Sequence, residues 1–351
     1  MRHYDYSFLA NSNVPAKLLN LLAGVWTMRA DNESRKDLFK TVFTELQRVA
    51  IVRSVKESNA IEGILTTNER LNAIVNQNSA PLNHNEFEIA AYRDVLSLIH
   101  RDYSLLDFDE ATILGFHKTL FENVDPERAG HYKMRDNAIV EIAADGTKRM
   151  RFEPIPANET AEAMRQLFLA YRVAANDANI NQLLLIPCVI LDFLCVHPFS
   201  DGNGRMSRLL TLLLLYKVGF DAGKYISFEE QISKNKQMYY ESLRRASINW
   251  HQNENDYFEF VNNFLFTLFN CYKELDKRFA TLNSRKINKS SRIEATVLNS
   301  LLPISKAEIC KILPDVSPTT VESVLSKLVK NEAVIKLGAG KNTRYIKNRS
   351  N

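Results

Sequence analysis

The sequence predicts an all-α protein with one small β-hairpin and a separate C-terminal domain. Apolar residues recur at helical spacing over much of the 351 residues, as in Phe39–Lys56. The pattern does not alternate between strands and helices, as a parallel α/β sheet would require. Before residue 285, strand-like text is confined to Ala138–Ile142 and Lys148–Phe152, which flank Asp145-Gly146, a hairpin turn signal. The body is therefore expected to be helical with one protruding hairpin.

Composition and charge exclude several classes of protein. Apolar residues make up 45% of the chain and charged residues 25%, with only 11 Gly and 10 Pro, which excludes collagen-like and wholly disordered chains. The longest apolar stretch, Leu183–Val196, contains Pro187 and Asp192 and is shorter than the roughly 18 residues of a membrane span. Met1–Ser12 lacks the apolar segment of a signal peptide, and the four scattered cysteines suit neither disulfides nor zinc. We expect a cytoplasmic protein that does not bind membranes.

The helical body divides into an N-terminal segment, residues 1–105, and a core, residues 106–284. Glu86–His100 and Thr160–Ala174 are amphipathic helices, whereas Leu209–Lys217 is almost entirely leucine and is expected to be buried on every side. His100 and His117 lie inside predicted helices and are interpreted as packing residues rather than ligands.

The C-terminal part, residues 285–351, carries 13 basic and 5 acidic residues, a charge of +8, whereas the rest of the chain carries 32 and 36, a charge of −4. A basic, serine-rich linker is expected at Ser284–Arg292. Ser317 and Pro318 form an N-cap followed by proline at the first helical position. The expected elements are helices Ile293–Leu301, Lys306–Leu313 and Pro318–Asn331 and strands Ala333–Leu337 and Thr343–Lys347, the order of a winged helix.

A winged helix leaves a second function open, that of a DNA-binding regulator. Several basic side chains of residues 285–351 could meet phosphates and bind nucleic acid weakly. However, Pro318–Asn331 has no Arg or Asn in its first turns to read bases. Because winged helices also mediate dimerisation and docking, a homo-oligomer is left open as well.

A twelve-residue segment, His197–Arg208, lies between an apolar helix and the leucine-rich helix. Gly202 and Gly204 flank Asn203, so the backbone can adopt unusual dihedral angles and approach a ligand closely. The segment leads into a helix, whose free N–H groups and positive dipole end favour an anion. This segment is therefore a candidate phosphate site.

Charged side chains of three kinds accompany this phosphate site. Arg205 and Arg208 are three residues apart and share a helix face, so both can reach phosphate oxygens. Asp201 offers a carboxylate oxygen suited to Mg²⁺ that also carries phosphate ligands. His197 can take a proton near neutral pH. Each feature alone is typical of an ordinary turn or salt bridge, but together they indicate phosphoryl or nucleotidyl transfer.

At these residues the chain resembles the Fic family, whose signature His-Pro-Phe-x-Asp/Glu-Gly-Asn-Gly-Arg-x-x-Arg it matches at every fixed position. Similar proteins are all-helical with a β-hairpin flap, and most transfer AMP from ATP to a Ser, Thr or Tyr hydroxyl of a target protein. The resemblance implies that His197 is the catalytic base, Asp201 binds Mg²⁺ and Phe199 anchors the loop. It assigns nucleotide binding to Gly202, Asn203, Gly204, Arg205, Met206, Ser207 and Arg208.

The likeness to the family extends to two other stretches. Gly130–Lys133 and the hairpin that follows resemble the flap that aligns the target peptide by strand addition, with Asp136–Val140 as the target-facing edge. Lys133 stands where the family usually has Arg. Tyr239 and Tyr240 fall where related proteins place tyrosines near the adenine. A purely structural hairpin and packing tyrosines are the alternatives.

An inhibitory motif precedes the core. Ser58 and Glu62 are four residues apart on one helical face, and Gly63 ends that helix. The pattern resembles the Ser/Thr-x-x-x-Glu-Gly/Asn motif of Fic proteins that carry an N-terminal autoinhibitory helix. The resemblance implies that Glu62 pairs with Arg208 and misplaces the phosphates of ATP for in-line attack. An ordinary helix end is the alternative, and Glu62 could also orient a water that removes AMP.

These observations together predict a protein adenylyltransferase that uses Mg-ATP, modifies a target protein and itself, and is inhibited in cis through Glu62. Some family members instead transfer UMP, phosphocholine or phosphate, so the nucleotide is left open beyond the resemblance. The target protein is not readable from the sequence.

Overall fold

The computed structural model describes residues 2–11, 13–36, 39–142, 147–283, 289–298, 300 and 302–348. Its α-helices are α1 Phe8–Asn11, α2 Ala16–Lys36, α3 Lys40–Ile61, α4 Asn68–Gln77, α5 His84–Asp102, α6 Glu110–Phe121, α7 Ala157–Ala175, α8 Gln182–Val196, α9 Asn203–Lys217, α10 Phe228–Lys234, α11 Lys236–Ala246, α12 Phe258–Asn283, α13 Lys289–Leu298, α14 Lys306–Ile312 and α15 Pro318–Lys330. Its strands are β1 Ile139–Ile142, β2 Lys148–Phe152, β3 Ile304–Ser305, β4 Val334–Leu337 and β5 Arg344–Lys347, and three short 3₁₀ turns lie at Ala222–Lys224, Trp250–Gln252 and Gly340–Asn342.

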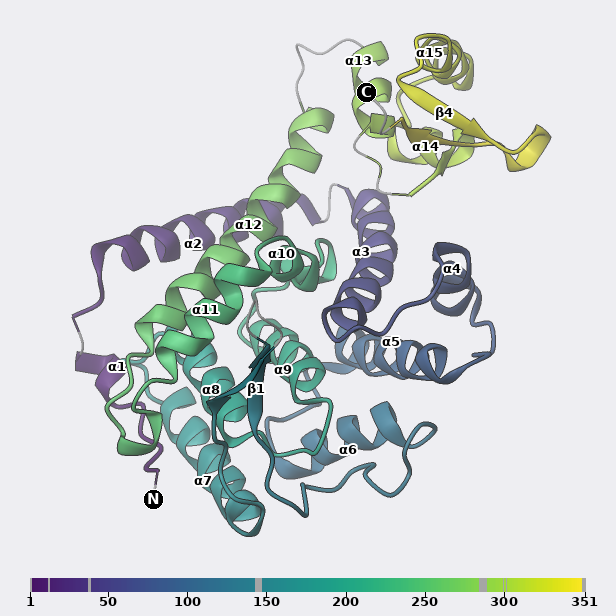
Figure 1. Cartoon of the computed structure of the whole chain (residues 1–351). Helices are drawn as coiled ribbons and strands as arrows, with labels where there is room; N and C mark the ends of the chain where they lie inside the picture. Colours follow the sequence, from purple (N-terminus) through teal and green to yellow (C-terminus); the bar gives the residue numbers. More distant parts are fainter. Residues whose placement is uncertain are drawn as a thin grey trace. The chain divides into compact units, whose positions relative to one another are not determined.

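The predicted all-α class is confirmed (Figure 1). The chain folds into two compact units. The first unit combines the residues up to Thr27 with Ala50–Cys271, and the second combines Met28–Val49 with the residues from Tyr272 onward. No helix of the described residues is both long and apolar enough to cross a lipid bilayer.

Helices α8 and α9 form the centre of the first unit. They pack against each other, α7 covers α8, and α5 and α6 pack against α9. Leu209–Tyr216 is buried throughout, as the leucine-rich pattern predicts. His100 and His117 are buried packing residues, also as predicted. This arrangement places the turn between α8 and α9 against a rigid core.

The predicted hairpin is present as an antiparallel pair of strands, β1 and β2. Ile139 pairs with Phe152 and Val140 with Met150, with a bulge between Ile139 and Val140. The predicted turn at Asp145-Gly146 lies outside the described residues. Because a two-stranded hairpin is only marginally stable alone, its position depends on what it packs against.

The C-terminal elements, green to yellow in Figure 1, form a small three-helix domain with a sheet ordered β3-β5-β4. The three predicted helices and both predicted strands are present, and Ser317 caps α15 by accepting the Thr320 N–H at 3.2 Å. Strand β3 was not predicted, because two residues carry no periodicity. The assignment as a winged helix stays a prediction.

The prediction of a linker at Ser284–Arg292 is wrong for its second half. Residues 284–288 lie outside the described residues, but α13 already begins at Lys289 and ends at Leu298 rather than Leu301. Ile293 and Val297, one helical turn apart, bury one face of α13 in the core of this domain.

Candidate active site

The imidazole of His197 lies at the C-terminal end of α8. Its backbone is left-handed, with φ of 51°, and its N–H caps the helix on the Phe193 carbonyl at 3.0 Å. The ring Nδ1 lies 3.2 Å from the Leu194 carbonyl oxygen, and since a carbonyl only accepts, Nδ1 holds the proton. Nε2 has no hydrogen-bond partner among the described residues. Burial lowers the pKa of His197 to about 4, so the ring is neutral at pH 7 and Nε2 can accept a proton.

The turn after His197 is fixed by side-chain amides. Asn203 accepts the Phe199 N–H at 3.0 Å and donates to the Phe199 carbonyl at 2.7 Å. Asn137 donates to the same carbonyl at 3.0 Å. The Phe199 ring is fully buried and stacks on His117 with ring centroids 3.8 Å apart. Phe199 therefore occupies the anchoring position that the sequence predicts, and the Asn203 side chain holds the turn.

The start of α9 brings the backbone close to its surroundings. Gly202 has φ of 79°, and a Cβ there would lie 2.6 Å from the Phe121 ring. A Cβ on Gly204 would collide with the Glu62 carboxylate. Gly202 therefore requires glycine, whereas at Gly204 a Cβ would displace the Glu62 carboxylate. That carboxylate already lies where the free N–H groups of a helix start favour an anion.

The predicted pair between Glu62 and Arg208 is present. Arg208 Nη2 donates to Glu62 Oε1 at 2.7 Å and to the Ser58 carbonyl at 3.0 Å, and Arg208 Nε donates to Ser58 Oγ at 2.8 Å. Arg208 and Ser58 are both buried, and Gly63 follows α3 with φ of 81°. Burial opposes the charge, but the Glu62 carboxylate raises the pKa of Arg208 above its ordinary value. Arg208 is therefore charged, and it is bound by Ser58 of α3 and by Glu62, which directly follows that helix.

The other predicted arginine, Arg205, is also engaged. It is 1% exposed, its Nη1 lies 2.6 Å from Glu88 Oε2, and its guanidinium lies 5.1 Å from the centre of the Phe121 ring. Glu88 belongs to α5, and no motif in the sequence links it to Arg205. No sequence pattern therefore predicted the contact of Glu88 with Arg205 or that of Asn137 with the turn.

A cavity of about 270 Å³ lies beside this turn. His197, Asp201 and Gly202–Gly204 line one side of it, and Ile139 and Phe152 of the hairpin line another. The cavity also contacts Glu62 and Tyr240. The structure therefore brings the predicted base, carboxylate, glycine turn and inhibitory glutamate to one cavity.

Five predicted nucleotide-binding residues lie away from the lining of this cavity, namely Arg205, Met206, Ser207, Arg208 and Tyr239. Met206 and Ser207 are buried inside α9, and Ser207 Oγ donates to the Gly204 carbonyl at 2.8 Å. Tyr239 is buried behind Tyr240, with the two ring centroids 5.6 Å apart and the rings nearly perpendicular. Arg205 is held by Glu88 as described above.

The carboxylate ligands available at this cavity determine which divalent cation it could hold. Asp201 is exposed, and its Oδ1 accepts the Gly202 N–H at 2.6 Å. No group of three or more His, Cys, Asp or Glu side chains that could hold a metal occurs in the described parts of the chain. One carboxylate fits Mg²⁺ that takes most of its ligands from phosphate and water.

Comparison with protein families identifies the segment that builds this cavity. The model of the Fic/DOC family matches residues 107–215, which include α6 to α8, the hairpin and all of α9 but its last two residues. Residues 107–215 of this chain therefore resemble the Fic/DOC family. The Fic match contains the complete segment His197–Arg208, whereas Glu62 precedes it.

Two curated relatives are named as adenylyltransferases. "Protein adenylyltransferase Fic" of Nematostella vectensis is 26% identical over 207 residues, which cover 56% of this chain and 44% of the relative. "Protein adenylyltransferase fic-1" of Caenorhabditis elegans is 25% identical over 124 residues, which cover 35% of this chain and 22% of the relative. The chain thus spans less than half the length of these curated relatives.

Solved structures agree on the fold. A Fic family protein from Desulfovibrio desulfuricans superposes with a TM-score of 0.63 at 19% identity, covering 96% of this chain and 98% of that chain. Fic-1 from C. elegans superposes with a TM-score of 0.54 at 20% identity, covering 74% of each chain. The helical Fic fold is therefore confirmed.

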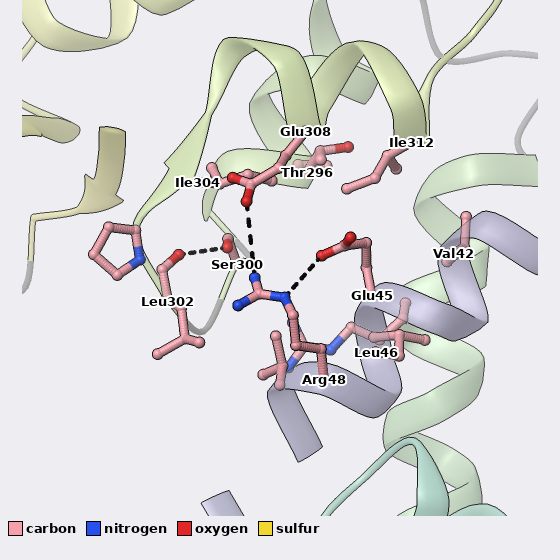
Figure 2. Close-up of a pocket in the computed structure, with 14 residues that line it drawn as sticks. Val42, Glu45, Leu46, Arg48, Thr296, Ser300, Leu302, Ile304, Glu308 and Ile312 are labelled. Atoms are coloured by element: carbon pink, nitrogen blue, oxygen red, sulfur yellow. Dashed lines mark hydrogen bonds and ion pairs between the residues drawn. The ribbon is translucent and has the colours of Figure 1, made fainter. Parts of the chain in front are cut away.

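A second pocket, in the second unit, has a different character. Figure 2 shows Arg48 between two carboxylates, with Nε 3.2 Å from Glu45 and Nη2 3.9 Å from Glu308. Apolar side chains of α3, β3 and α14, among them Leu46, Ile304 and Ile312, form much of its wall. Glu45 and Glu308 both pair with Arg48, so these charged side chains of the pocket balance one another.

Proposed function

We propose that this chain is a protein adenylyltransferase that transfers AMP from Mg-ATP to a hydroxyl of a target protein, and that Glu62 inhibits it. The observation that carries the proposal is the shared cavity, where His197 faces the glycine turn at the start of α9. The family match and the names of the two curated relatives support the same reaction.

His197 acts as the general base in this proposal. Its Nδ1 proton is held by the Leu194 carbonyl, so Nε2 receives the proton of the attacking hydroxyl. The hydroxyl oxygen then forms a bond to the α-phosphorus, and the bond from that phosphorus to the pyrophosphate oxygen breaks. The neutral ring required at the start follows from the lowered pKa of His197.

The start of α9 supplies the anion site in this reaction. The backbone at Gly202–Gly204 can approach phosphate oxygens closely because no Cβ intervenes. Asp201 would hold Mg²⁺, which neutralises phosphate charge. Arg208 would bind the distal phosphates once Glu62 is removed, because its Nη2 is now occupied by that carboxylate.

Inhibition follows from the same contacts. The Glu62 carboxylate lies against Gly204 and Arg208, where the terminal phosphate would otherwise be held. With that position filled, the α-phosphorus of bound ATP is not aligned for attack, and misalignment of this kind lowers rates strongly. Displacement of Glu62 therefore activates the enzyme.

The test is Glu62→Gly with radiolabelled ATP and Mg²⁺. We expect self-modification to rise at least about tenfold over the unmodified chain. Mass spectrometry should find the mass of AMP on a Ser, Thr or Tyr hydroxyl, and UTP in place of ATP should give less product. Glu57→Ala, which removes a carboxylate of α3 five residues before Glu62, is the matched control and should leave the rate unchanged. No incorporation by Glu62→Gly would contradict the transferase activity.

Two alternatives have distinct outcomes. If the chain mainly removes AMP through a water oriented by Glu62, Glu62→Gly should lose that hydrolysis. If it is a DNA-binding regulator, the C-terminal domain should supply free positive charge. There, Lys306 pairs with Glu322 at 2.6 Å, and Arg344 pairs with Glu308 at 3.2 Å. These pairs reduce the charge available to phosphates, which favours the enzyme.

A further inference from the structure

A buried carboxylate in α8 organises three distant segments of the first unit. Asp192 is fully buried, five residues before His197. Its oxygens accept from the Trp250 indole N–H at 2.6 Å, the Tyr6 hydroxyl at 2.7 Å and the Tyr257 hydroxyl at 2.9 Å. Arg2 Nη2 lies 3.3 Å away and balances the charge. A buried charge with this many partners fixes each of them in place.

Trp250 is the member of this cluster that is held most completely. Its ring is 0% exposed, and the Arg2 guanidinium lies 4.8 Å from the ring centre. Arg2 Nη1 also donates to the Trp250 carbonyl at 2.7 Å and to Asn255 at 2.9 Å. The 3₁₀ turn Trp250–Gln252 is therefore bonded to Asp192 of α8 through the Trp250 indole and to Arg2 through the Trp250 carbonyl.

The same 3₁₀ turn also contacts the end of strand β2. The edge of Trp250 meets the Phe152 ring with centroids 5.9 Å apart, and His251 stacks on the same ring at 5.3 Å with 10° between the planes. His251 Nε2 lies 2.8 Å from the Glu153 carbonyl oxygen and donates to it. Phe152 lines the active-site cavity together with its cross-strand partner Ile139.

We propose that His251 is a positioning residue for the acceptor side of the active site, and that Trp250, anchored on Asp192 and Arg2, supports it. Strands β1 and β2 form a two-stranded hairpin, which needs an outside contact to hold one position. Trp250 and His251 supply that contact at Phe152 and Glu153. The hairpin wall of the cavity is thereby held at a set distance from His197, which in-line attack requires.

This inference rests on the proposed function, and its test uses the full chain with Glu62→Gly as the parent. His251→Ala removes the stacking and the hydrogen bond, whereas His251→Gln restores a donor to the Glu153 carbonyl. Gln252→Ala, an exposed neighbour in the same turn, is the control. Because His251 is exposed, these variants should fold as the parent does.

We expect His251→Ala to lower the rate of self-modification at saturating ATP by about tenfold to 100-fold, with the KM for ATP unchanged. His251→Gln should recover most of the rate, and Gln252→Ala should equal the parent. A rate for His251→Ala equal to the parent's, or a loss that appears in the KM for ATP, would overturn the inference.

Hydrogen exchange separates this inference from the proposed function. The backbone amides of residues 150–153 should exchange faster in His251→Ala than in the parent and slow again in His251→Gln. If the Glu62→Gly parent transfers no nucleotide, the proposed function fails, yet the exchange experiment still decides whether His251 positions β2. Equal exchange in all variants would overturn the positioning role.

Discussion

Helix α8 carries two buried polar groups that lie one and a half turns apart and behave differently. Asp192 receives hydrogen bonds on both carboxylate oxygens and has Arg2 as its counter-charge. His197 uses Nδ1 on the Leu194 carbonyl and turns its other ring nitrogen to the cavity, where no described residue bonds it. Both oxygens of Asp192 thus accept hydrogen bonds, whereas Nε2 of His197 has no hydrogen-bond partner among the described residues.

The difference separates a structural polar group from a reactive one. Burial is costly for both, and for Asp192 the protein offsets that cost with partners. Burial shifts the pKa of both groups: it raises that of Asp192, and it lowers that of His197 to about 4, which keeps the imidazole neutral and able to accept a proton. Substitutions at the two positions should therefore affect different properties.

The largest expected effect is on catalysis. His197→Ala in the Glu62→Gly parent should lower the rate of AMP incorporation by about 10³-fold, because a general base contributes on that order. Incorporation of label from ATP over time measures this. His197→Asn is the second variant, since Asn tolerates the left-handed backbone and cannot act as a base. A loss below tenfold in both variants would assign the base elsewhere.

The second effect is on stability rather than chemistry. Asp192→Asn removes the counter-charge of a buried Arg2, and leaving such a charge unpaired should lower the free energy of unfolding by about 3 kcal/mol. Urea unfolding measures the change. The double variant with Arg2→Met should lose less than the sum of the two single variants, because the residues form one network. Additive losses would show that the two charges are independent.

The smallest expected effect is on the pH dependence of the rate. An imidazole with the ordinary pKa of about 6.5 would lose about tenfold in its neutral form between pH 7.5 and 5.5. Because burial lowers the pKa of His197 to about 4, its neutral form still predominates at pH 5.5. The Glu62→Gly parent should therefore lose less than about twofold in initial rate over this range. A tenfold loss would mean that the base is solvated as an ordinary histidine.

Much of the fold follows from periodicity. The helical class, the hairpin and the three C-terminal helices were predicted because each depends on neighbours along the chain. Helix ends were less predictable: α13 begins at Lys289, inside the predicted linker, and ends at Leu298 rather than at the predicted Leu301. Strand β3 was missed because its pairing with β5 is a tertiary contact.

The candidate site divides along the same line. The sequence alone predicted that His197, Asp201 and the glycines at the start of α9 would share one site, since they are close along the chain and their mutual geometry is local. Only the tertiary structure decided how those residues are used. In the folded chain Glu88 pairs with Arg205, and the Asn203 side chain is hydrogen-bonded to the Phe199 backbone. Asp192 contacts both Arg2 and Trp250. Those partners come from separate helices and loops, and folding, rather than spacing along the chain, brings them into contact.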